Sequence, residues 1–171
     1  MKRKEIMKFT QTPQDATKTC CINQNTGFYF VINTSDLPLV QGYTWCSNSG
    51  YAYNAEVGMA HRLILNAPTD MVVDHKNHNP RDNTKANLRV CTRKENSRNR
   101  LRPRHNKSGA KGVSWHRGLK KWQAVITVDG KDKFLGAFEE REDAILARDT
   151  AEREFFGEFA CPNFPAELIP A

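Results

Sequence analysis

The sequence predicts an α+β protein built from two small modules joined by a basic linker. A chain of 171 residues that is 39% hydrophobic can fill one ordinary core or two small ones, which excludes a larger set of domains. Two stretches, 20–57 and 121–138, contain runs in which hydrophobic residues recur at every second position, as in strands. The first module is expected to contain an antiparallel sheet, and the second a three-stranded sheet packed on one helix.

The first module is expected to come after a polar, frayed segment over 1–19. Beyond this segment, Phe28, Phe30 and Ile32 occupy alternate positions, which places them on one face of a strand. Turn triplets that contain asparagine and glycine separate the strand-like runs, as short antiparallel hairpins require. This sheet is expected to support the remainder of the module and to carry no chemistry of its own.

A helix, a strand, a polar loop and a second helix are expected next. Residues 59–65 form the short apolar helix, and residues 71–75 form a strand that ends abruptly. The loop over 76–87 is rich in asparagine and aspartate, which favour structured turns. The run Thr-Arg-Lys-Glu at 92–95 is a capping box, so the second helix is expected to begin at its arginine.

The second module has the pattern of a hairpin followed by a helix. Residues 121–128 alternate between two faces, and Asp129–Gly130 is the turn of a tight hairpin that continues into 131–138. Residues 139–156 are expected to form a helix that ends at Gly157. The residues expected to form its buried stripe are Ala144, Ala147, Ala151 and Phe155.

The charge of the chain is distributed unevenly. The net charge is +7, from 26 basic and 19 acidic residues, but residues 81–122 alone hold 14 basic and 2 acidic ones. Residues 123–171 hold 5 basic and 11 acidic ones. A block of such positive charge repels itself in a compact fold without a counter-anion, so contact with nucleic acid is expected, with an ordinary solvated face as the alternative.

Membrane insertion and a cysteine-based scaffold are not indicated. No run approaches the roughly 20 apolar residues of a membrane span, and the lysine-rich start lacks the apolar centre of a secretion signal. We expect a cytosolic protein, in the cytoplasm of the host cell if a phage encodes it. The five cysteines are scattered without a C-x-x-C pair and are expected to be reduced and packed, with a redox or metal role for the pair at 20–21 as the alternative.

Four residues in 72–96 form a set that suits phosphodiester hydrolysis. Such hydrolysis needs a base for water, ligands for a hard cation and neutralisation of the leaving oxygen. Neighbours on a strand project apart, so Asp74 and His75 are expected to have separate tasks. The oxygens of Asp74 and Asn96 suit magnesium or manganese, and His75 suits a general base. An oxygen near Asn87 is expected to hold the proton on the far ring nitrogen, although each residue alone is more often structural.

The order and spacing of these residues resemble the HNH endonucleases of the phage and intron homing type. The resemblance covers about residues 28–100, and its motifs are His61-Arg62-Leu63, Asp74-His75, Asn87-Leu88-Arg89 and Glu95-Asn96. It implies a ββα-metal core that cuts DNA with one divalent ion and leaves 5′ phosphate and 3′ hydroxyl ends. It also implies that His75 is the base, that Asp74 and Asn96 bind the metal, and that Asn87 orients the base.

Two further histidines stand near this motif. His78 stands where relatives often have glycine, so it is expected to be a plain loop residue, with a third metal ligand as the alternative. His61 is adjacent to apolar residues in 59–65, which favours a structural hydrogen bond over metal ligation.

The second module resembles the DNA-binding domain of the plant ethylene-response-factor (Apetala) class over about residues 107–165. The resemblance implies that the sheet enters the major groove of DNA while the helix packs behind it. With Trp122 in the core, the residues expected to meet DNA are Ser114, His116, Arg117, Lys121, Gln123 and Thr127. Plant members carry arginines at several of these positions, so docking on phosphates is expected to outweigh base reading. For Trp115, base stacking and core packing are both left open.

The linker offers a second set of cations for a phosphate backbone. These residues are Arg98, Arg100, Arg102, Arg104, Lys107 and Lys111. On an extended segment they would follow a phosphate backbone or lie in the minor groove, and a simple flexible tether is the alternative.

The combined expectation is a site-recognising DNA endonuclease with two functional domains. The expected segments are the polar segment 1–19, the nuclease domain 20–100, the linker 101–110 and the DNA-binding domain 111–165. The expected cofactor is one Mg²⁺ or Mn²⁺ ion per active site, and the expected partner is double-stranded DNA, bound by a monomer without a membrane or an organic cofactor. The alternative is a non-catalytic DNA-binding regulator with the same fold, whereas a zinc module lacks suitably spaced ligands.

Overall fold

The chain is a mixed α/β protein with several small sheets and few helices. A computed structural model describes residues 6–101 and 105–164. The chain divides into two compact units, Met1–Asn96 and Ser97–Ala171, and each unit has a hydrophobic core of its own. No helix among the described residues is both long enough and apolar enough to cross a membrane.

The first unit begins with an antiparallel sheet in the order β1-β2-β3. Its strands are β1 (Met7–Thr12), β2 (Asp15–Asn23) and β3 (Tyr29–Asn33). The expectation of a frayed segment over 1–19 is therefore wrong for its described part. Met7 and Phe9 are partly buried against the core while Lys8 and Thr10 are exposed, so the polar composition reflects one solvated face of a paired strand.

The rest of the first unit packs around the apolar face of β3. Phe28, Phe30 and Ile32 are buried as their alternation predicts, and Phe30 meets the fully buried Trp45 edge to face. The indole of Trp45 donates a hydrogen bond of 2.9 Å to the carbonyl of Val40. The elements of this region are the 3-10 helix η1 (Thr34–Asp36), α1 (Leu37–Val40), β4 (Cys46–Asn48), β5 (Tyr51–Asn54), β6 (Gly58–Met59) and α2 (Ala60–Leu65).

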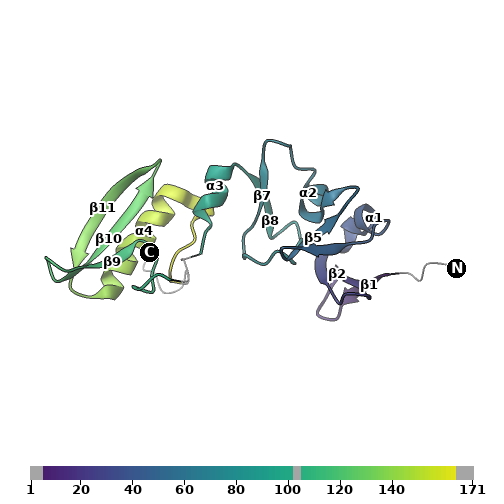
Figure 1. Ribbon diagram of the computed structural model, residues 1–171, viewed down its shortest axis with the longest axis horizontal. Helices are drawn as coiled ribbons and strands as arrows, with labels where there is room; N and C mark the ends of the chain where they lie inside the picture. Colours follow the sequence, from purple (N-terminus) through teal and green to yellow (C-terminus); the bar gives the residue numbers. More distant parts are fainter. Residues whose placement is uncertain (1–5, 102–104, 165–171) are drawn as a thin grey trace. The chain divides into compact units, whose positions relative to one another are not determined.

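A two-stranded antiparallel ladder comes next, formed by β7 (Val72–His75) and β8 (Leu88–Cys91). Helix α3 (Arg93–Arg98) is the next element in the chain and crosses the boundary between the two units (Figure 1). The capping box is confirmed, because the backbone N–H of Thr92 donates to the carboxylate of Glu95 at 2.8 Å. In return, the N–H of Glu95 donates to the hydroxyl of Thr92 at 3.1 Å.

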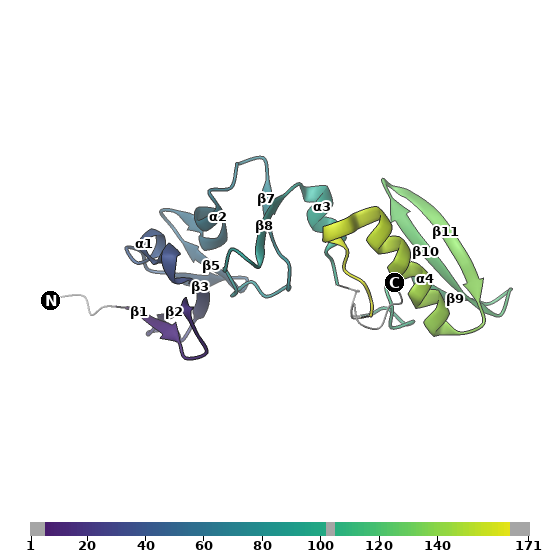
Figure 2. The ribbon, with the colours of Figure 1, turned by 180° about the vertical axis from the view of Figure 1, so that it is seen from behind.

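The second unit is a three-stranded sheet with one helix across one face, as Figures 1 and 2 show. Its elements are β9 (Val113–His116), β10 (Lys121–Val128), β11 (Lys131–Phe138), α4 (Arg141–Phe156) and the 3-10 helix η2 (Gly157–Phe159). The expected hairpin turn is present, since Asp129 and Gly130 have φ values of 54° and 77°. Positive φ at both positions matches the twist of the strands they join.

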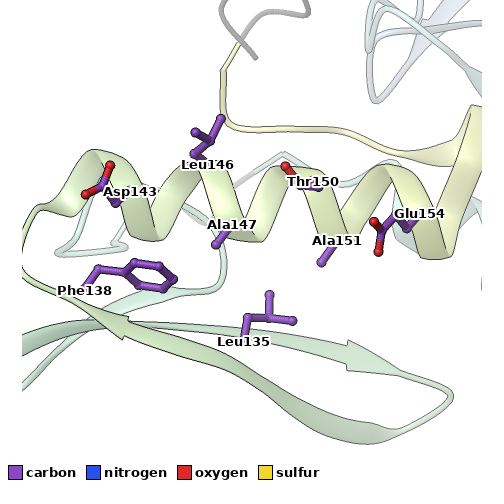
Figure 3. A pocket seen from close by; sticks show the side chains of 8 residues that line it. All are labelled: Leu135, Phe138, Asp143, Leu146, Ala147, Thr150, Ala151 and Glu154. Atoms are coloured by element: carbon purple, nitrogen blue, oxygen red, sulfur yellow. The ribbon is translucent and has the colours of Figure 1, made fainter. Parts of the chain in front are cut away.

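The buried face of α4 is wider than the expected alanine stripe. Ala147 and Ala151 point toward the sheet (Figure 3), but Phe155 remains 39% exposed. The fully buried Asp149 and Glu152 lie on a second face, which loops of the same unit cover. Asp149 accepts hydrogen bonds from Asn163 and Phe164, and Glu152 from Lys111 and Arg148. The polar stripe therefore escaped a prediction based on hydrophobic periodicity.

An apolar groove remains between α4 and β11. Its floor includes Leu135 and Phe138, and the acidic Asp143 and Glu154 stand near its two ends along the helix (Figure 3). These carboxylates repel phosphate, so the helix side of this unit is unsuited to nucleic acid.

Candidate active site

The end of strand β7 carries a buried ion pair. Asp74 is opposite Arg89 in the ladder, and each side chain is less than a tenth exposed. Atom Oδ2 of Asp74 accepts from Nε of Arg89 at 2.9 Å and from Nη2 at 2.6 Å. Two charge-assisted bonds fix the orientation of the carboxylate and compensate the cost of burying it.

His75, the next residue, is buried beside this pair and faces Asn83. Its Nε2 atom lies 3.3 Å from Oδ1 of Asn83. Burial lowers the pKa of His75, whereas the hydrogen bond to Asn83 and the charges of Asp74 and Asp82 act in the opposite direction. The net lowering favours a neutral imidazole near pH 7, which is the form that can accept a proton.

Two other rings enclose His75. The ring centroids of His61 and Tyr51 lie 5.2 and 5.6 Å from that of His75. Burial lowers the pKa of His61 to about 4, and the nearby His75 and Arg62 act in the same direction. Atom Nδ1 of His61 is buried and makes no hydrogen bond within the described residues, so the expected structural hydrogen bond is not found at that atom.

Asn87 holds the loop that joins the two strands. Its side-chain oxygen accepts from the N–H of Asn77 at 3.0 Å, and its side-chain nitrogen donates to the carbonyl of Asp82 at 2.8 Å. Its own carbonyl accepts from the N–H of Lys76 at 2.9 Å. The described contact with the proposed base therefore comes from Asn83. Sequence analysis did not single out Asn83, because nothing in the sequence distinguishes it from the other asparagines of this loop.

His78 occupies a turn of the same loop. Its φ is 60°, and its N–H donates to the carbonyl of His75 at 2.9 Å. This left-handed conformation is one that glycine adopts without steric cost.

Asn96 lies in the first turn of α3, half-buried, with its backbone N–H bound to the carbonyl of Thr92 at 3.0 Å. Its carboxamide makes no hydrogen bond to another described residue. Burial raises the pKa of the Cys91 thiol, and the charge of Asp74 acts in the same direction. A hydrogen bond from the backbone of Asn96 lowers this pKa. The backbone of Asn96 thus contacts Cys91, whereas Asp74 acts on the thiol through its charge.

The donor chemistry near Cys91 fits a hard divalent cation. Asp74 offers a carboxylate and Asn96 a carboxamide oxygen, the kinds of ligand that magnesium and manganese prefer. Within 6–101 and 105–164, no three His, Cys, Asp or Glu side chains gather in a way that could hold a metal ion. A cation site here would therefore need the amide oxygen, with water and substrate completing the coordination shell.

In the second unit, five of the six predicted DNA-facing residues share the face of the sheet opposite α4, and Arg117 lies in the turn after β9. Ser114 pairs with Gln123, and His116 pairs with Lys121, and cross-strand partners lie on the same face. Thr127 continues this face, with its hydroxyl donating to Asp132 at 2.6 Å.

This face also carries Phe134, an aromatic residue of β11 that sequence reasoning missed. Phe134 pairs with Val125 and is 63% exposed. Trp115 is on the helix side of β9, at its edge, in contact with Trp122 and 47% exposed.

A pocket of about 380 Å³ brings part of the basic linker beside the sheet. Lys107 and Arg117 line it together with Ser114 and Trp115. Both cations are exposed, and the pocket lies within the second unit. It therefore has the charge and the exposure that a phosphate group requires.

Lys111 has a structural place instead. Its ammonium group lies 2.6 Å from the buried carboxylate of Glu152 and also donates to the carbonyls of Arg100 and Cys161. Arg98 is placed over the ring of Phe156. Arg100 is exposed, whereas Arg102 and Arg104 lie outside the described residues.

Comparisons with known proteins support a nuclease. Residues 59–98, which contain Asp74, His75, Asn87 and Asn96, match the HNH endonuclease family. A protein of Acanthamoeba polyphaga mimivirus named "Uncharacterized HNH endonuclease L560" is 29% identical over 151 residues, or 83% of this chain and 78% of that protein. "Protein 3.8" of Escherichia phage T7 is 34% identical over 93 residues, or 54% of this chain and 76% of that protein. No solved structure matches.

The match over residues 59–98 and the similarity to the mimivirus protein therefore support an HNH nuclease. This confirms the nuclease resemblance stated from the sequence. HNH nucleases generally use a divalent metal ion.

Proposed function

We propose that the protein is a DNA endonuclease of the homing type, in which the first unit cuts and the second unit docks on DNA. The observation that carries the proposal is the buried His75 at the end of β7, next to the ion-paired Asp74 and inside the family match. In this proposal, β7, β8 and α3 form the ββα-metal unit of the nuclease.

The chemistry is set by the residues around the scissile phosphate. His75, neutral and buried, takes a proton from water as the water attacks phosphorus. Asn87 holds the loop over 76–87 in shape, and Arg89 holds the carboxylate of Asp74 in place. Asp74 and Asn96 would hold one Mg²⁺ or Mn²⁺ ion, which when bound supplies positive charge to the leaving 3′ oxygen.

The nuclease proposal is tested by relaxation of a supercoiled plasmid with magnesium, with manganese and with EDTA. We expect cleavage with the divalent ions and none in EDTA. His75→Ala is expected to abolish cutting and to retain DNA binding, because the base acts in the chemical step. His78→Gly, in the same loop, is the matched control and is expected to cut normally. Cutting by His75→Ala at the parental rate would refute the assignment, and binding without any cutting would favour the regulator.

For docking, we propose that DNA meets the side of the second unit that carries Lys107 and Arg117. The pocket beside these cations, which Trp115 and Trp122 also line, supports DNA contact at the edge of the sheet formed by β9. Asp143 and Glu154 disfavour the groove along α4. Ser114, His116, Lys121, Gln123 and Thr127 would lie along the same DNA, with Phe134 as an apolar contact. Arg98 and Arg100, with Arg102 and Arg104 outside the described residues, would add phosphate contacts along the linker.

The docking proposal is tested through the salt dependence of DNA affinity. Each phosphate contact contributes a slope of about −0.9 to log K against log salt concentration. Arg117→Gln is therefore expected to weaken binding and to reduce the slope by about 1. Lys133→Gln, which removes the same charge on the helix side next to Phe155, is the control. Equal slopes in the parent and Arg117→Gln would contradict the proposal.

A further inference from the structure

The side chain of Asn83 stands out among the polar residues of the first unit, because it is fully buried and meets the imidazole of the proposed base. Asn83 has no exposed surface, and its Oδ1 atom lies 3.3 Å from Nε2 of His75. A carboxamide oxygen only accepts hydrogen bonds, so a neutral ring that bonds to it must carry its proton on Nε2.

The orientation of the carboxamide is set by a second contact. The Nδ2 atom of Asn83 donates to the carbonyl oxygen of Pro80 at 3.4 Å. A carbonyl oxygen cannot donate, so the amide nitrogen must face Pro80 and the amide oxygen must face His75. Exchange of the two amide atoms would set oxygen against oxygen at Pro80.

The backbone of Asn83 is held by strand β3, far away in the sequence. The N–H of Asn83 donates to the carbonyl of Val31 at 2.7 Å, and the N–H of Val31 donates to the carbonyl of Arg81 at 2.7 Å. This pair of bonds is a parallel bridge between β3 and the loop. The first sheet therefore has a part in the chemistry, because it fixes the residue that faces the base.

We propose that Asn83 is a positioning residue that holds His75 in the tautomer with the proton on Nε2 and the lone pair on Nδ1. Nδ1 is then the atom that takes the proton from water. The proton transfer rests on the proposed nuclease function, whereas the tautomer itself does not.

The tautomer is measured by long-range ¹H–¹⁵N correlation of the histidine ring nitrogens. The sample is the full, metal-free chain at a pH where His75 is neutral, and the signals of His75 are assigned from their loss in His75→Gln. In the parent we expect protonated Nε2 and bare Nδ1. In Asn83→Leu, which has a similar size but no acceptor, we expect a mixture of both tautomers. Asn83→Asp, which restores the acceptor, is expected to restore the parental tautomer. Asn79→Ala is the matched control, because the side chain of Asn79 accepts a hydrogen bond from the backbone N–H of Arg81 and not from the ring of His75.

The measurement on the parent needs no variant, so it decides the proposal even if Asn83→Leu does not fold. A parent with the proton on Nδ1, or a folded Asn83→Leu with the parental tautomer unchanged, would overturn it. On DNA, kcat of Asn83→Leu is expected to fall about 10- to 100-fold with KM unchanged, and Asn83→Asp to recover part of the loss. A protein that has the expected tautomer but never cuts DNA would refute the nuclease proposal and leave the tautomer assignment standing.

Discussion

At the level of single residues, the most consequential contact is the buried ion pair of Asp74 and Arg89. Replacement of Arg89 by leucine leaves a buried carboxylate without its guanidinium partner. We expect a loss of about 3 to 5 kcal/mol in the free energy of unfolding, measured by urea denaturation. Arg93→Leu, at the exposed start of α3, is the control and is expected to change stability by less than about 0.5 kcal/mol. Equal stabilities of the two variants would contradict the structural role of the pair.

His61 gives the protein a dependence of stability on pH. Its pKa in the fold is lowered to about 4 from an ordinary value near 6.5. Between these two values the unfolded chain binds the proton more readily, so stability is expected to fall as the pH drops from about 6.5 toward 4 and to level off below that.

The loss attributable to His61 is expected to reach up to about 3 kcal/mol, since each pKa unit is worth about 1.4 kcal/mol. The measurement is the free energy of unfolding of the parent and of His61→Phe between pH 7 and pH 4. The variant keeps a ring against Tyr51 and is expected to show a flatter curve, with His75 accounting for the remaining slope. The exposed His105→Ala serves as the control, and parallel curves for the parent and His61→Phe would contradict the prediction.

At the level of elements, the basic segment before β9 combines two kinds of cation. Lys111 is bound to the buried carboxylate of Glu152, whereas Lys107 is exposed in the pocket beside Arg117. We expect Lys111→Met to lower the free energy of unfolding by about 3 kcal/mol without a change in the salt slope of DNA binding. For Lys107→Met we expect a reduced salt slope of DNA binding and an unchanged free energy of unfolding. The two variants act as controls for each other. A reduced salt slope for Lys111→Met would return this residue to the DNA-binding set.

The start of β9 depends on a glycine. Gly112 has a φ of 72°, and a Cβ atom there would lie 2.5 Å from the carbonyl oxygen of Val125 and against the side chain of Arg148. Gly112→Ala is expected to cost more than about 3 kcal/mol, because backbone strain and overlap add. Gly130→Ala shares a similar φ with nothing within 4 Å, so it isolates the strain and is expected to cost about 1 kcal/mol. Thermal unfolding of both variants measures the difference, and similar losses would refute it.

At the level of the whole molecule, the two units have separate cores. Phe30 and Trp45 belong to the core of the first unit, and Ala124 and Ile145 to that of the second. We therefore expect two transitions in calorimetry of the full chain, with Arg89→Leu lowering one and Gly112→Ala the other. A single transition that both variants shift would show that the units unfold together.

Much of the architecture could be predicted because its signals are local. The alternation at Phe28, Phe30 and Ile32, the capping box at Thr92 and the turn at Asp129–Gly130 each lie within a few residues of the structure they specify. The predictions of secondary structure and burial failed where the residues concerned are polar. Strand β1 was taken for a frayed segment, and the acidic stripe of α4 was not recognised, because hydrophobic periodicity does not register polar residues that are buried with partners.

The candidate site, too, was predicted only in part from the sequence. The set of Asp74, His75, Asn87 and Asn96 was visible as a motif, and the family match over 59–98 confirms the nuclease resemblance. Their individual roles, and the resemblance of the second unit to the Apetala class, remain predictions. Asn83 could not be found from the sequence, since its position beside His75 depends on a backbone bridge to Val31.

The order of residues alone was enough to reveal the kind of protein, the strands and helices that carry its motif, and the basic segment. Folding in three dimensions decided which of those cations stay available to a polyanion and which asparagine meets the imidazole. Lys111 and Glu152 are 41 positions apart, and such a pairing is set by how strands, helix and loops pack. Propensities act between near neighbours, whereas the partner of a buried polar group is chosen by the tertiary structure that surrounds it.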